Sequence, residues 1–516
     1  MEPPFRVADP ASPQVAFAGI DEVGLVLGDV DRGAAMRVDG VEFAALEDIP
    51  AGHKVAIRPI AAGAPVHKYG EIIGIAAHDI PIGAHVHVHN LRVGPHAGRG
   101  RGDAEQDPVL DRGSWSAPAV PTRAHFLGYR RPDGRSATRN YIAVLPSVNC
   151  SATVSRIIAQ RANDLHRGVP GLDGVIALTH ELGCGMAEGT AGDEILRRTL
   201  RGYAEHANFV KVMMVSLGCE INQPVNVLGD GVPVETLAIQ ELGGSAATVN
   251  AALARIDRFV AETASLHREP IPVSELTLGL QCGGSDAYSG LTANPTLGVA
   301  ADLLVAAGGK VVLGETPEIY GAEHILRARA ADRAVAGRID ELIVWWRQYA
   351  AAHGAQMDDN PSKGNLDGGI TTIWEKSLGA ILKSGTSALN DVVRYAQPVT
   401  VGGLTFMDTP GYDPVSATGM VAGGANLLAF TTGRGSVFGS RPAPCLKIST
   451  TTRLYQRMRG DIDFDAGPAM SRAEQIRHGT LLFEALVDMA SGRPSKSEEL
   501  GFGTEEIVPW RIGAVM

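Results

Sequence analysis

The sequence predicts an α/β protein, in which a small N-terminal β-rich module precedes two α/β lobes with mainly parallel sheets. Glycine is abundant (62 residues) and aromatic residues make up only 5%, which favours tight turns between strands and helices over an aromatic-rich β shell. Short apolar runs separated by Gly, Pro and Asp fill residues 1–92, whereas apolar runs alternate with helical patterns from Phe126 onward. The chain has 516 residues, so several hydrophobic cores are expected.

Composition excludes some classes of protein. Hydrophobic residues are 45% and charged residues 20%, which is typical of a globular chain. The formal net charge of −11 provides no basic surface for nucleic acid, so an anionic substrate would need local Arg, Lys or metal. The N-terminal segment lacks the apolar stretch of a secretory signal, and no apolar run approaches the roughly 18–20 residues of a membrane span. Five cysteines are too few for a disulfide framework, so we expect a cytoplasmic protein with reduced thiols.

Residues 1–93 form the predicted β-rich module, with strands expected at Val23–Leu27, Val55–Ile57, Ile72–Ala76 and Val86–Val88. His85, His87 and His89 alternate, so on a strand they would share one side. That side is either a solvated edge or a polar face turned towards an anion or a metal. Lys54 and Lys68, each of which directly follows a histidine in the sequence, favour an anion. Residues 94–122 carry Gly, Pro and mixed charge without periodicity, which predicts a linker.

The first α/β lobe is expected over residues 123–268, and the second over 269–516, where Gly-rich loops follow the C-terminal strands. The strands and helices expected in the first lobe are Tyr141–Leu145, Val175–Leu178, Asp193–Ala204, Val210–Val215 and Ala247–Leu266. Those expected in the second lobe are Leu276–Leu280, Gly298–Ala307, Lys310–Leu313, Ile339–Tyr349, Leu404–Met407 and Leu427–Phe430.

Three cysteines, Cys184, Cys219 and Cys282, each follow a predicted strand and stand beside glycine. The carboxyl ends of parallel strands are where open α/β sheets bind ligands. The spacing is unlike a zinc ribbon, and thiolates suit iron, zinc or copper. Three thiolates could therefore hold one Fe²⁺, another divalent metal, or an iron–sulfur cluster whose last iron faces the substrate, although buried cysteines also serve as small core residues. Cys150 and Cys445 lack this context and are interpreted as structural.

Other polar side chains are expected at the same strand ends. His180, Glu220 and Asp286 are suited to proton transfer or to supporting a metal. Arg434, in TTGRGS, could pair with a substrate carboxylate. The glycine fingerprints of NAD-binding and ATP-binding proteins are absent, so neither nucleotide is expected.

Long motifs throughout the chain resemble one enzyme family. They are GHKVA, KYGEIIG, HVHVHN, GYRRPDGRSATRN, HELGCG, SLGCE, QCGGSDAYSGLTANPTLG, ETPEIYGAE, NPSKGNLDGG, EKSLG, KSG and FTTGRGSVFG. They resemble the altronate and galactarate dehydratases, which are related to sulfolactate sulfo-lyase, and the first three resemble the SAF-type domain of that family. The resemblance implies loss of water from a 2,3-dihydroxy acid to give a 2-keto-3-deoxy acid, with a divalent metal, usually iron. HVHVHN and ETPEIYGAE resemble the altronate branch most.

The resulting hypothesis is a dehydratase acting on a small sugar acid, most simply D-altronate, with galactarate or sulfolactate as alternatives and a non-catalytic sugar-acid-binding protein as a remote one. No nucleic-acid or membrane partner is expected, and the chain could form a homo-oligomer. The metal would lie on Cys184, Cys219 and Cys282, with His180, Glu220 and Asp286 transferring protons. The N-terminal module would act as a lid over the substrate, whose binding residues are expected to be His53, Lys54, Tyr69, Arg139, Ser285, Asn294 and Arg434.

Overall fold

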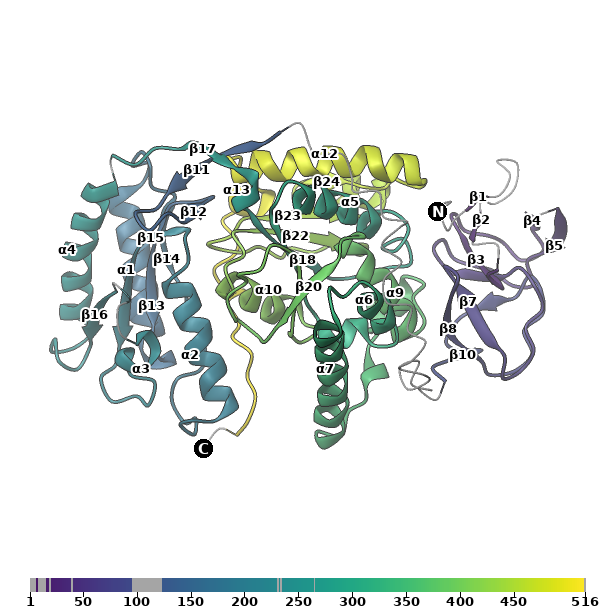
Figure 1. Cartoon of the computed structure of the whole chain (residues 1–516), viewed down its shortest axis with the longest axis horizontal. Helices are drawn as coiled ribbons and strands as arrows, with labels where there is room; N and C mark the ends of the chain where they lie inside the picture. Colours follow the sequence, from purple (N-terminus) through teal and green to yellow (C-terminus); the bar gives the residue numbers. More distant parts are fainter. Residues whose placement is uncertain are drawn as a thin grey trace.

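The computed structural model describes residues 6–7, 15–17, 20–38, 40–94, 123–229, 232, 234–263 and 265–514. The linker predicted at 94–122 lies outside the described residues apart from Gly94. Figure 1 shows the N-terminal module on the right, the second lobe in the middle and the first lobe on the left. The small β-rich region and the parallel sheets confirm the predicted fold class.

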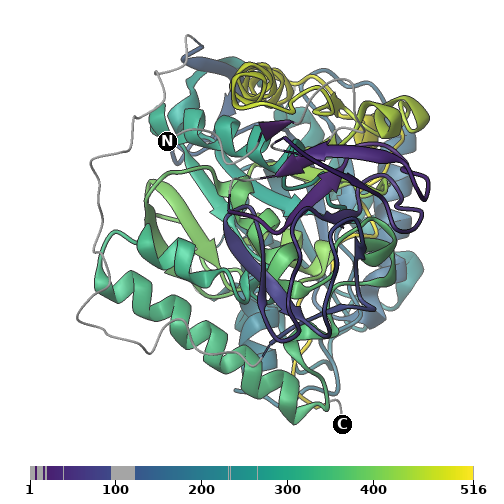
Figure 2. The same ribbon diagram turned by 90° about the vertical axis from the view of Figure 1, so that its right-hand side faces the viewer.

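The N-terminal module is made of short antiparallel strands in three small sheets, ordered β1-β2-β3-β6-β9, β10-β8-β7 and β4-β5. Their bounds are β1 Arg6–Val7, β2 Val15–Phe17, β3 Val23–Val26, β4 Ala35–Val38, β5 Val41–Ala44, β6 Lys54–Ala56, β7 Pro65–Lys68, β8 Glu71–Ala76, β9 His85–Val86 and β10 Leu91–Arg92. In Figure 2 this module faces the viewer in front of the second lobe, which it contacts through the ion pairs of Lys54 and Lys68 with Glu375.

The predicted strand through Val88 is wrong, because β9 ends at Val86. The side chain of Asn90 accepts a hydrogen bond from the backbone N–H of His87 (2.9 Å) and donates one to the carbonyl of His85 (2.8 Å). This local side-chain bonding closes a turn and competes with the sheet. The histidines therefore do not share a face through strand alternation.

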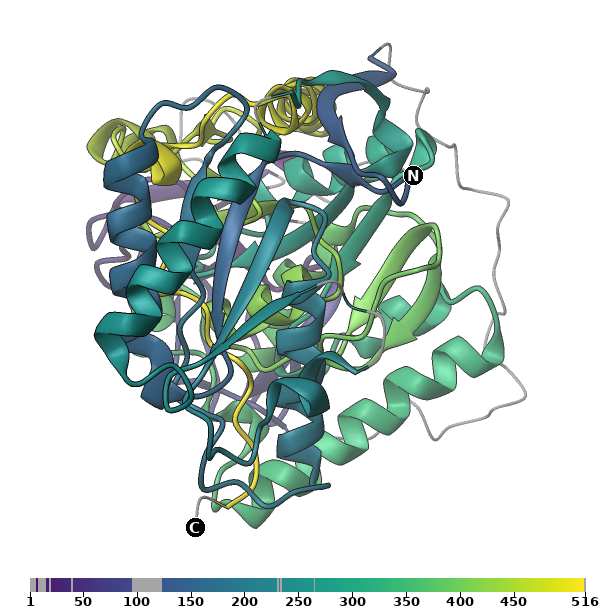
Figure 3. The same ribbon diagram turned by 90° about the vertical axis from the view of Figure 1, so that its left-hand side faces the viewer.

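The first lobe is built on a parallel sheet ordered β14-β13-β15-β16. Its elements are β13 Tyr141–Pro146, α1 Ala152–His166, β14 Gly174–Ala177, α2 Ala191–Ala204, β15 Phe209–Ser216, α3 Pro224–Leu228, β16 Glu235–Ala238 and α4 Ser245–Thr263. Helices α1 and α4 bury one face of the sheet, as Figure 3 shows, and α2 covers the face turned towards the second lobe. An antiparallel sheet of β11 (His125–Arg130), β12 (Ser136–Ala137) and β17 (Glu269–Pro272) brings together the start and end of this lobe.

The second lobe contains a seven-stranded parallel sheet ordered β20-β21-β19-β18-β22-β23-β24. Its strands are β18 Thr277–Cys282, β19 Lys310–Leu313, β20 Leu389–Val393, β21 Gly403–Met407, β22 Leu427–Thr432, β23 Cys445–Ser449 and β24 Phe464–Asp465. Its helices are α5 Ala293–Ala306, α6 Glu323–Ala328, α7 Arg333–Ala352, α8 Lys363–Asp367, α9 Ile373–Ile381, α10 Asp413–Ala422, α11 Thr452–Arg457, α12 Arg472–Ala490 and α13 Lys496–Glu499. Short 3₁₀ turns include Thr316–Ile319 and Leu382–Ser384.

Packing places β18 at the centre of the molecule. Every residue of this strand is buried, as expected for a parallel strand covered on both faces. Helix α5 is buried from Ala293 to Leu304 because it lies between the sheet and α12. One apolar core continues from the N-terminal module through the second lobe to the α2 face of the first lobe. Among the helices in the described part of the chain, none is long and apolar enough to cross a membrane.

Candidate active site

A buried cluster of charged side chains lies at the carboxyl ends of β18 and β19. Cys282 is the last residue of β18 rather than the first residue after it. The ammonium of Lys383 donates to its Sγ at 2.8 Å, while carboxylate oxygens of Glu318 and Glu315 lie 3.7 and 3.9 Å from the same sulfur. The Lys383 ammonium also contacts Glu315 at 3.2 Å, and Lys376 contacts Glu318 at 2.8 Å.

Burial sets the ionisation of this cluster. It raises the pKa of the Cys282 thiol to about 12, so the thiol keeps its proton near neutral pH. Burial also raises the pKa of Glu315. Burial opposes the ionisation of Glu318 as well, but the ammonium of Lys376 outweighs it and lowers the pKa of that carboxyl. Glu315 adopts a left-handed backbone (φ 67°), a conformation costly for a non-glycine residue that persists because the surrounding structure holds it.

A second charged cluster joins the N-terminal module to α9. Glu375 accepts hydrogen bonds from the ammonium groups of Lys54 (2.8 Å) and Lys68 (2.6 Å), and all three side chains are buried. Burial opposes ionisation of Glu375, yet the two ammonium groups lower its pKa to about 2. The backbones also touch, since a Cβ at Gly369 would lie 2.1 Å from the carbonyl oxygen of Gly52. The module and the second lobe thus share a tight polar interface.

Three histidines extend this interface. Nδ1 of His53 lies 3.0 Å from Nε2 of His85, and Nδ1 of His87 lies 3.2 Å from the hydroxyl of Thr371. One ring nitrogen from each imidazole lies within 4.8 Å of the others. Burial lowers the pKa of His85 to about 3 and of His87 to about 4, so both rings are neutral at physiological pH. Neutral imidazole is the form that ligates metals.

A narrow pocket between the module and α9 contains four of the predicted site residues. It is lined by Tyr69, Ser285, Asp286 and Asn294, together with Lys68, Glu375 and Lys376. Burial raises the pKa of Asp286 to about 6, although its carboxylate accepts hydrogen bonds from Ser289 and from Thr450 (3.1 Å). A carboxylate with this pKa can exchange protons near neutral pH. The carboxyl ends of β18 and β19, the N-terminal module and α9 therefore form one continuous polar region.

Comparisons with known proteins identify this arrangement. Residues 14–94 match the family described as "Altronate/galactarate dehydratase SAF domain". Residues 128–264 match "D-galactarate dehydratase/Altronate hydrolase, second domain", and residues 273–515 match "D-galactarate/Altronate dehydratase, C-terminal". The chain is 34% identical to "Altronate dehydratase" of Bacillus subtilis (96% of this chain, 98% of that protein). It is also 34% identical to "Altronate dehydratase" of Escherichia coli (97% and 99%) and 35% identical to "Galactarate dehydratase (L-threo-forming)" of that organism (95% of each).

The chain belongs to the galactarate/altronate dehydratase family. It is a hydro-lyase of that type, and its substrate class is sugar acids. The SAF-type domain of the family is the N-terminal module, whose residues Lys68 and Tyr69 line the same pocket as Asp286 and Glu375.

Two of the residues predicted for proton transfer lie in the first lobe of this dehydratase instead of at the pocket. His180 is buried, its Nε2 lies 3.0 Å from the carbonyl of Pro146 and its Nδ1 accepts the N–H of Leu182, so neither ring nitrogen is free for proton exchange. The carboxylate of Glu220 accepts hydrogen bonds from Ser147 and from the N–H of Gly218. Both side chains hold loops together.

The predicted metal set is also divided between the lobes. Cys184 and Cys219 are exposed on the first lobe, whereas Cys282 is buried in the second. Among the described residues, two groups of potential ligands have all their ligand atoms within 4.8 Å of one another, and neither contains Cys184 or Cys219. The strand-end pattern located each thiol correctly at a sheet edge, but it could not tell that two different sheets were involved.

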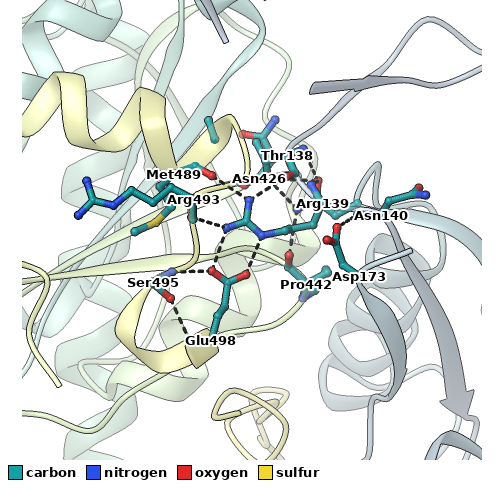
Figure 4. A network of polar contacts seen from close by, with 12 residues as sticks. Thr138, Arg139, Asn140, Asp173, Asn426, Pro442, Met489, Arg493, Ser495 and Glu498 are labelled. Carbon is teal, nitrogen blue, oxygen red and sulfur yellow. Dashed lines mark hydrogen bonds and ion pairs between the residues drawn. The ribbon is translucent and has the colours of Figure 1, made fainter. Parts of the chain in front are cut away.

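Arg139 is not among the residues that line the pocket and lies in the network of Figure 4. Its guanidinium pairs with the carboxylate of Glu498 (2.7 and 2.8 Å) and donates to the carbonyl of Met489 (2.8 Å). These contacts join the first lobe to the C-terminal segment. Arg434 is exposed; the pKa of the nearby Asp367 is lowered mainly by the hydrogen bond from Lys363, and the charge of Arg434 adds to this effect.

The sequence interpretation did not assign roles to Glu375, Lys376 or Lys383. Lys376 and Lys383 stand seven positions apart in the sequence, and α9 and the following turn carry both to buried carboxylates. The signal was available in EKSLGAILKS, where three charged side chains occur in a mostly apolar segment. Charged residues are rarely buried without a partner, so such a segment indicates buried ion pairs.

Proposed function

We propose that this chain is an altronate dehydratase that removes water from D-altronate to give the 2-keto-3-deoxy acid. The observation that carries the proposal is the pocket that Asp286, with its pKa of about 6, lines together with Lys68 and Lys376. A base near neutrality in one pocket with two ammonium groups is suited to removing a proton next to a carboxylate, because the ammonium groups stabilise the negative charge that develops.

The charge balance of the interface favours a substrate with one carboxylate. Lys54 and Lys68 already share Glu375, while Lys376 pairs with Glu318 and Lys383 with Glu315. The four lysine ammonium groups therefore exceed the three glutamate carboxylates that they contact by only one charge. An aldonate such as altronate carries one carboxylate, whereas galactarate and sulfolactate carry two anionic groups. A second anion would need a further cation in the pocket.

In the proposed reaction Asp286 removes the proton from C2, and the ammonium groups of Lys68 and Lys376 hold the substrate carboxylate. Burial raises the pKa of Tyr69, so its hydroxyl retains a proton that it can donate to the C3 hydroxyl as water leaves. The enol that remains tautomerises to the keto acid. Ser285 and Asn294, which line the same pocket, are the proposed contacts for the substrate hydroxyls.

A divalent metal, expected from the family resemblance, fits the histidine group better than the cysteine group. His53, His85 and His87 present neutral nitrogens close together, a ligand type suited to iron or zinc. At Cys282 the ammonium of Lys383 already takes the position that a cation would need. When bound, such a metal supplies Lewis-acid stabilisation of negative charge on a substrate oxygen.

The pocket must open to admit substrate. Its volume is about 10 Å³, which is room for roughly one water molecule. A six-carbon acid is much larger, so the proposal includes movement of the N-terminal module as a lid. The lid would close by remaking the bonds between Glu375 and the two module lysines.

The test is turnover by anaerobically purified, metal-replete protein with D-altronate, galactarate and sulfolactate in parallel. Formation of a 2-keto acid from altronate, with much slower turnover of galactarate and no sulfite from sulfolactate, is expected. Preference for galactarate would overturn the one-carboxylate argument. Binding of aldonates without turnover would overturn the enzymatic proposal and favour a sugar-acid-binding protein.

A further inference from the structure

Three exposed cysteines gather at one edge of the first lobe, and only two of them were singled out from the sequence. Cys150 follows β13, Cys184 follows β14 and Cys219 follows β15. These three strands are parallel neighbours, with β13 between the other two. Their carboxyl ends therefore meet, and the three loops that carry the thiols leave the sheet side by side.

Hydrogen bonds next to each cysteine fasten these loops together. The backbone N–H of Asn149 donates to the carbonyl of Leu182 (3.0 Å), and its side-chain amide donates to the carbonyl of His180 (3.2 Å). The side-chain amide of Asn222 donates to the carbonyl of Ser147 (2.9 Å). The buried residues His180 and Glu220 add further bonds within the same region. The loops thus form a fixed support for the thiols.

Glycine allows the closest approach of two of these loops. Gly183 precedes Cys184 and has a φ of 106°, a region that disfavours side chains. A Cβ at this position would lie 2.5 Å from the carbonyl oxygen of Ser147 and 2.8 Å from Cα of Val148. Any larger residue would push the Cys184 loop away from the Cys150 loop.

The side-chain amide of Gln240 donates a hydrogen bond to the sulfur of Cys219. Nε2 of Gln240 lies 3.3 Å from Sγ of Cys219, in position to donate a hydrogen bond. Hydrogen bonds to cysteine sulfur are a means by which proteins tune iron–sulfur sites. This contact is independent of the clustering of the cysteines and indicates that the sulfur acts as an acceptor.

We propose that Cys150, Cys184 and Cys219 ligate a 4Fe–4S cluster through three thiolates, leaving the fourth iron without a protein ligand. A single tetrahedral metal with bonds of about 2.3 Å would need thiolates about 3.8 Å apart. The three thiols are not among the described groups whose ligand atoms all lie within 4.8 Å of one another. A cluster binds each thiolate to a different iron and so accepts the wider spacing.

This site goes beyond the proposed dehydration at Asp286. Figure 1 places the first lobe on the far side of the second lobe from the N-terminal module. The ligand for the open iron would be an oxygen anion, such as a carboxylate or hydroxide, reaching the exposed sheet edge. The cluster would accordingly be detected whether or not altronate is the substrate.

The experiment is anaerobic purification of the full chain from iron-replete cells, followed by iron and acid-labile sulfide analysis and visible and EPR spectra. Wild-type protein is expected to contain about four acid-labile sulfides per chain. Each of three single variants is expected to lose this sulfide together with about four irons per chain: Cys150→Ser, Cys184→Ser and Cys219→Ser. Cys282→Ser and Cys445→Ala are the matched controls and are expected to keep both. Absence of sulfide from wild type, or its retention in any of the three serine variants, would overturn the proposal.

A second measurement covers the case in which a serine variant fails to fold. Alkylation of folded wild type is expected to leave Cys150, Cys184 and Cys219 unmodified as isolated and to modify them after the iron is removed with a chelator. Modification of these thiols in protein that still holds its sulfide would contradict the assignment.

Discussion

The two α/β lobes place cysteines at equivalent positions and give them opposite surroundings. In the second lobe Cys282 is 3% exposed and lies 2.8 Å from an ammonium, with two glutamates beyond it. In the first lobe Cys150, Cys184 and Cys219 are exposed, and the side-chain partner found for Cys219 is a neutral amide. The end of a parallel strand can thus carry reactive side chains in both lobes, but the neighbouring residues bury Cys282 as a protonated thiol and leave Cys150, Cys184 and Cys219 accessible to a ligand.

The largest effect is expected at the pocket of the second lobe. Asp286→Asn removes the proposed base and should lower kcat/KM for altronate by about 10²–10⁴, the contribution typical of general base catalysis. The measurement is steady-state turnover with metal-replete protein. Asp408→Asn is the matched control, because Asp408 is also a buried carboxyl at this sheet, bonded to Thr316 and Trp346 and absent from the pocket lining. Equal losses in both variants would contradict the assignment of Asp286.

The pH profile tests the same carboxyl without removing it. Asp286 must lose its proton to act as a base, and burial raises its pKa to about 6. Below that pH kcat/KM should therefore fall about tenfold per pH unit, and above it should reach a plateau. In Asp286→Asn the residual activity should lose this inflection. An inflection near the ordinary range of an aspartic acid, with no change in the variant, would count against this role.

Glu375→Gln should loosen the contact between the module and the second lobe. The substitution leaves Lys54 and Lys68 buried without a carboxylate partner, so we expect a loss of about 3–5 kcal/mol in the free energy of unfolding. Urea unfolding monitored by circular dichroism measures this change in the free energy of unfolding. Glu484→Gln is the control, since its partner Arg123 lies at the surface and an exposed pair contributes at most about 1 kcal/mol. A Glu375 variant as stable as the control would refute the argument.

Arg139→Ala separates a structural role from the substrate-binding role predicted from the sequence. Loss of the pair with Glu498 should lower the free energy of unfolding by about 3 kcal/mol, because the pair is largely buried. The KM for altronate should stay close to that of wild type, since Arg139 does not line the pocket. A large rise in KM with unchanged stability would restore the original assignment.

The sequence was most informative where a feature is local. Apolar runs ending in cysteine located the ends of β14, β15 and β18, and the motif around Asp286 placed this carboxyl beside Ser285 and Asn294. Local reasoning failed where partners are distant. The partner of Arg139 is 359 residues away, and Lys383 reaches Cys282 across 101 residues. Neither pairing leaves a trace in spacing or periodicity.

One further error has a local cause, and one further interpretation was limited by local context. The alternation of His85, His87 and His89 imitates a strand, but the hydrogen bonds of Asn90 end the strand at Val86. Cys150 was interpreted as structural because it lacks the adjacent glycine that stands beside Cys184 and Cys219. The strand order places all three cysteines at one sheet edge, because β13 lies between β14 and β15, and this neighbourhood is not visible in the sequence around Cys150.

Thiol reactivity is the most sensitive way to sharpen the contrast between the lobes, and it requires no substitution. In folded protein stripped of metal, an alkylating reagent should modify Cys150, Cys184 and Cys219, which are exposed, and leave Cys282 and Cys445 unmodified, because both are buried. Burial also raises the pKa of Cys282 to about 12, so little reactive thiolate is present even if reagent enters. Peptide mass spectrometry before and after unfolding in urea assigns each site. Rapid modification of Cys282 in the folded chain would mean that its lobe opens to solvent there, and the distinction between the two thiol environments would no longer hold.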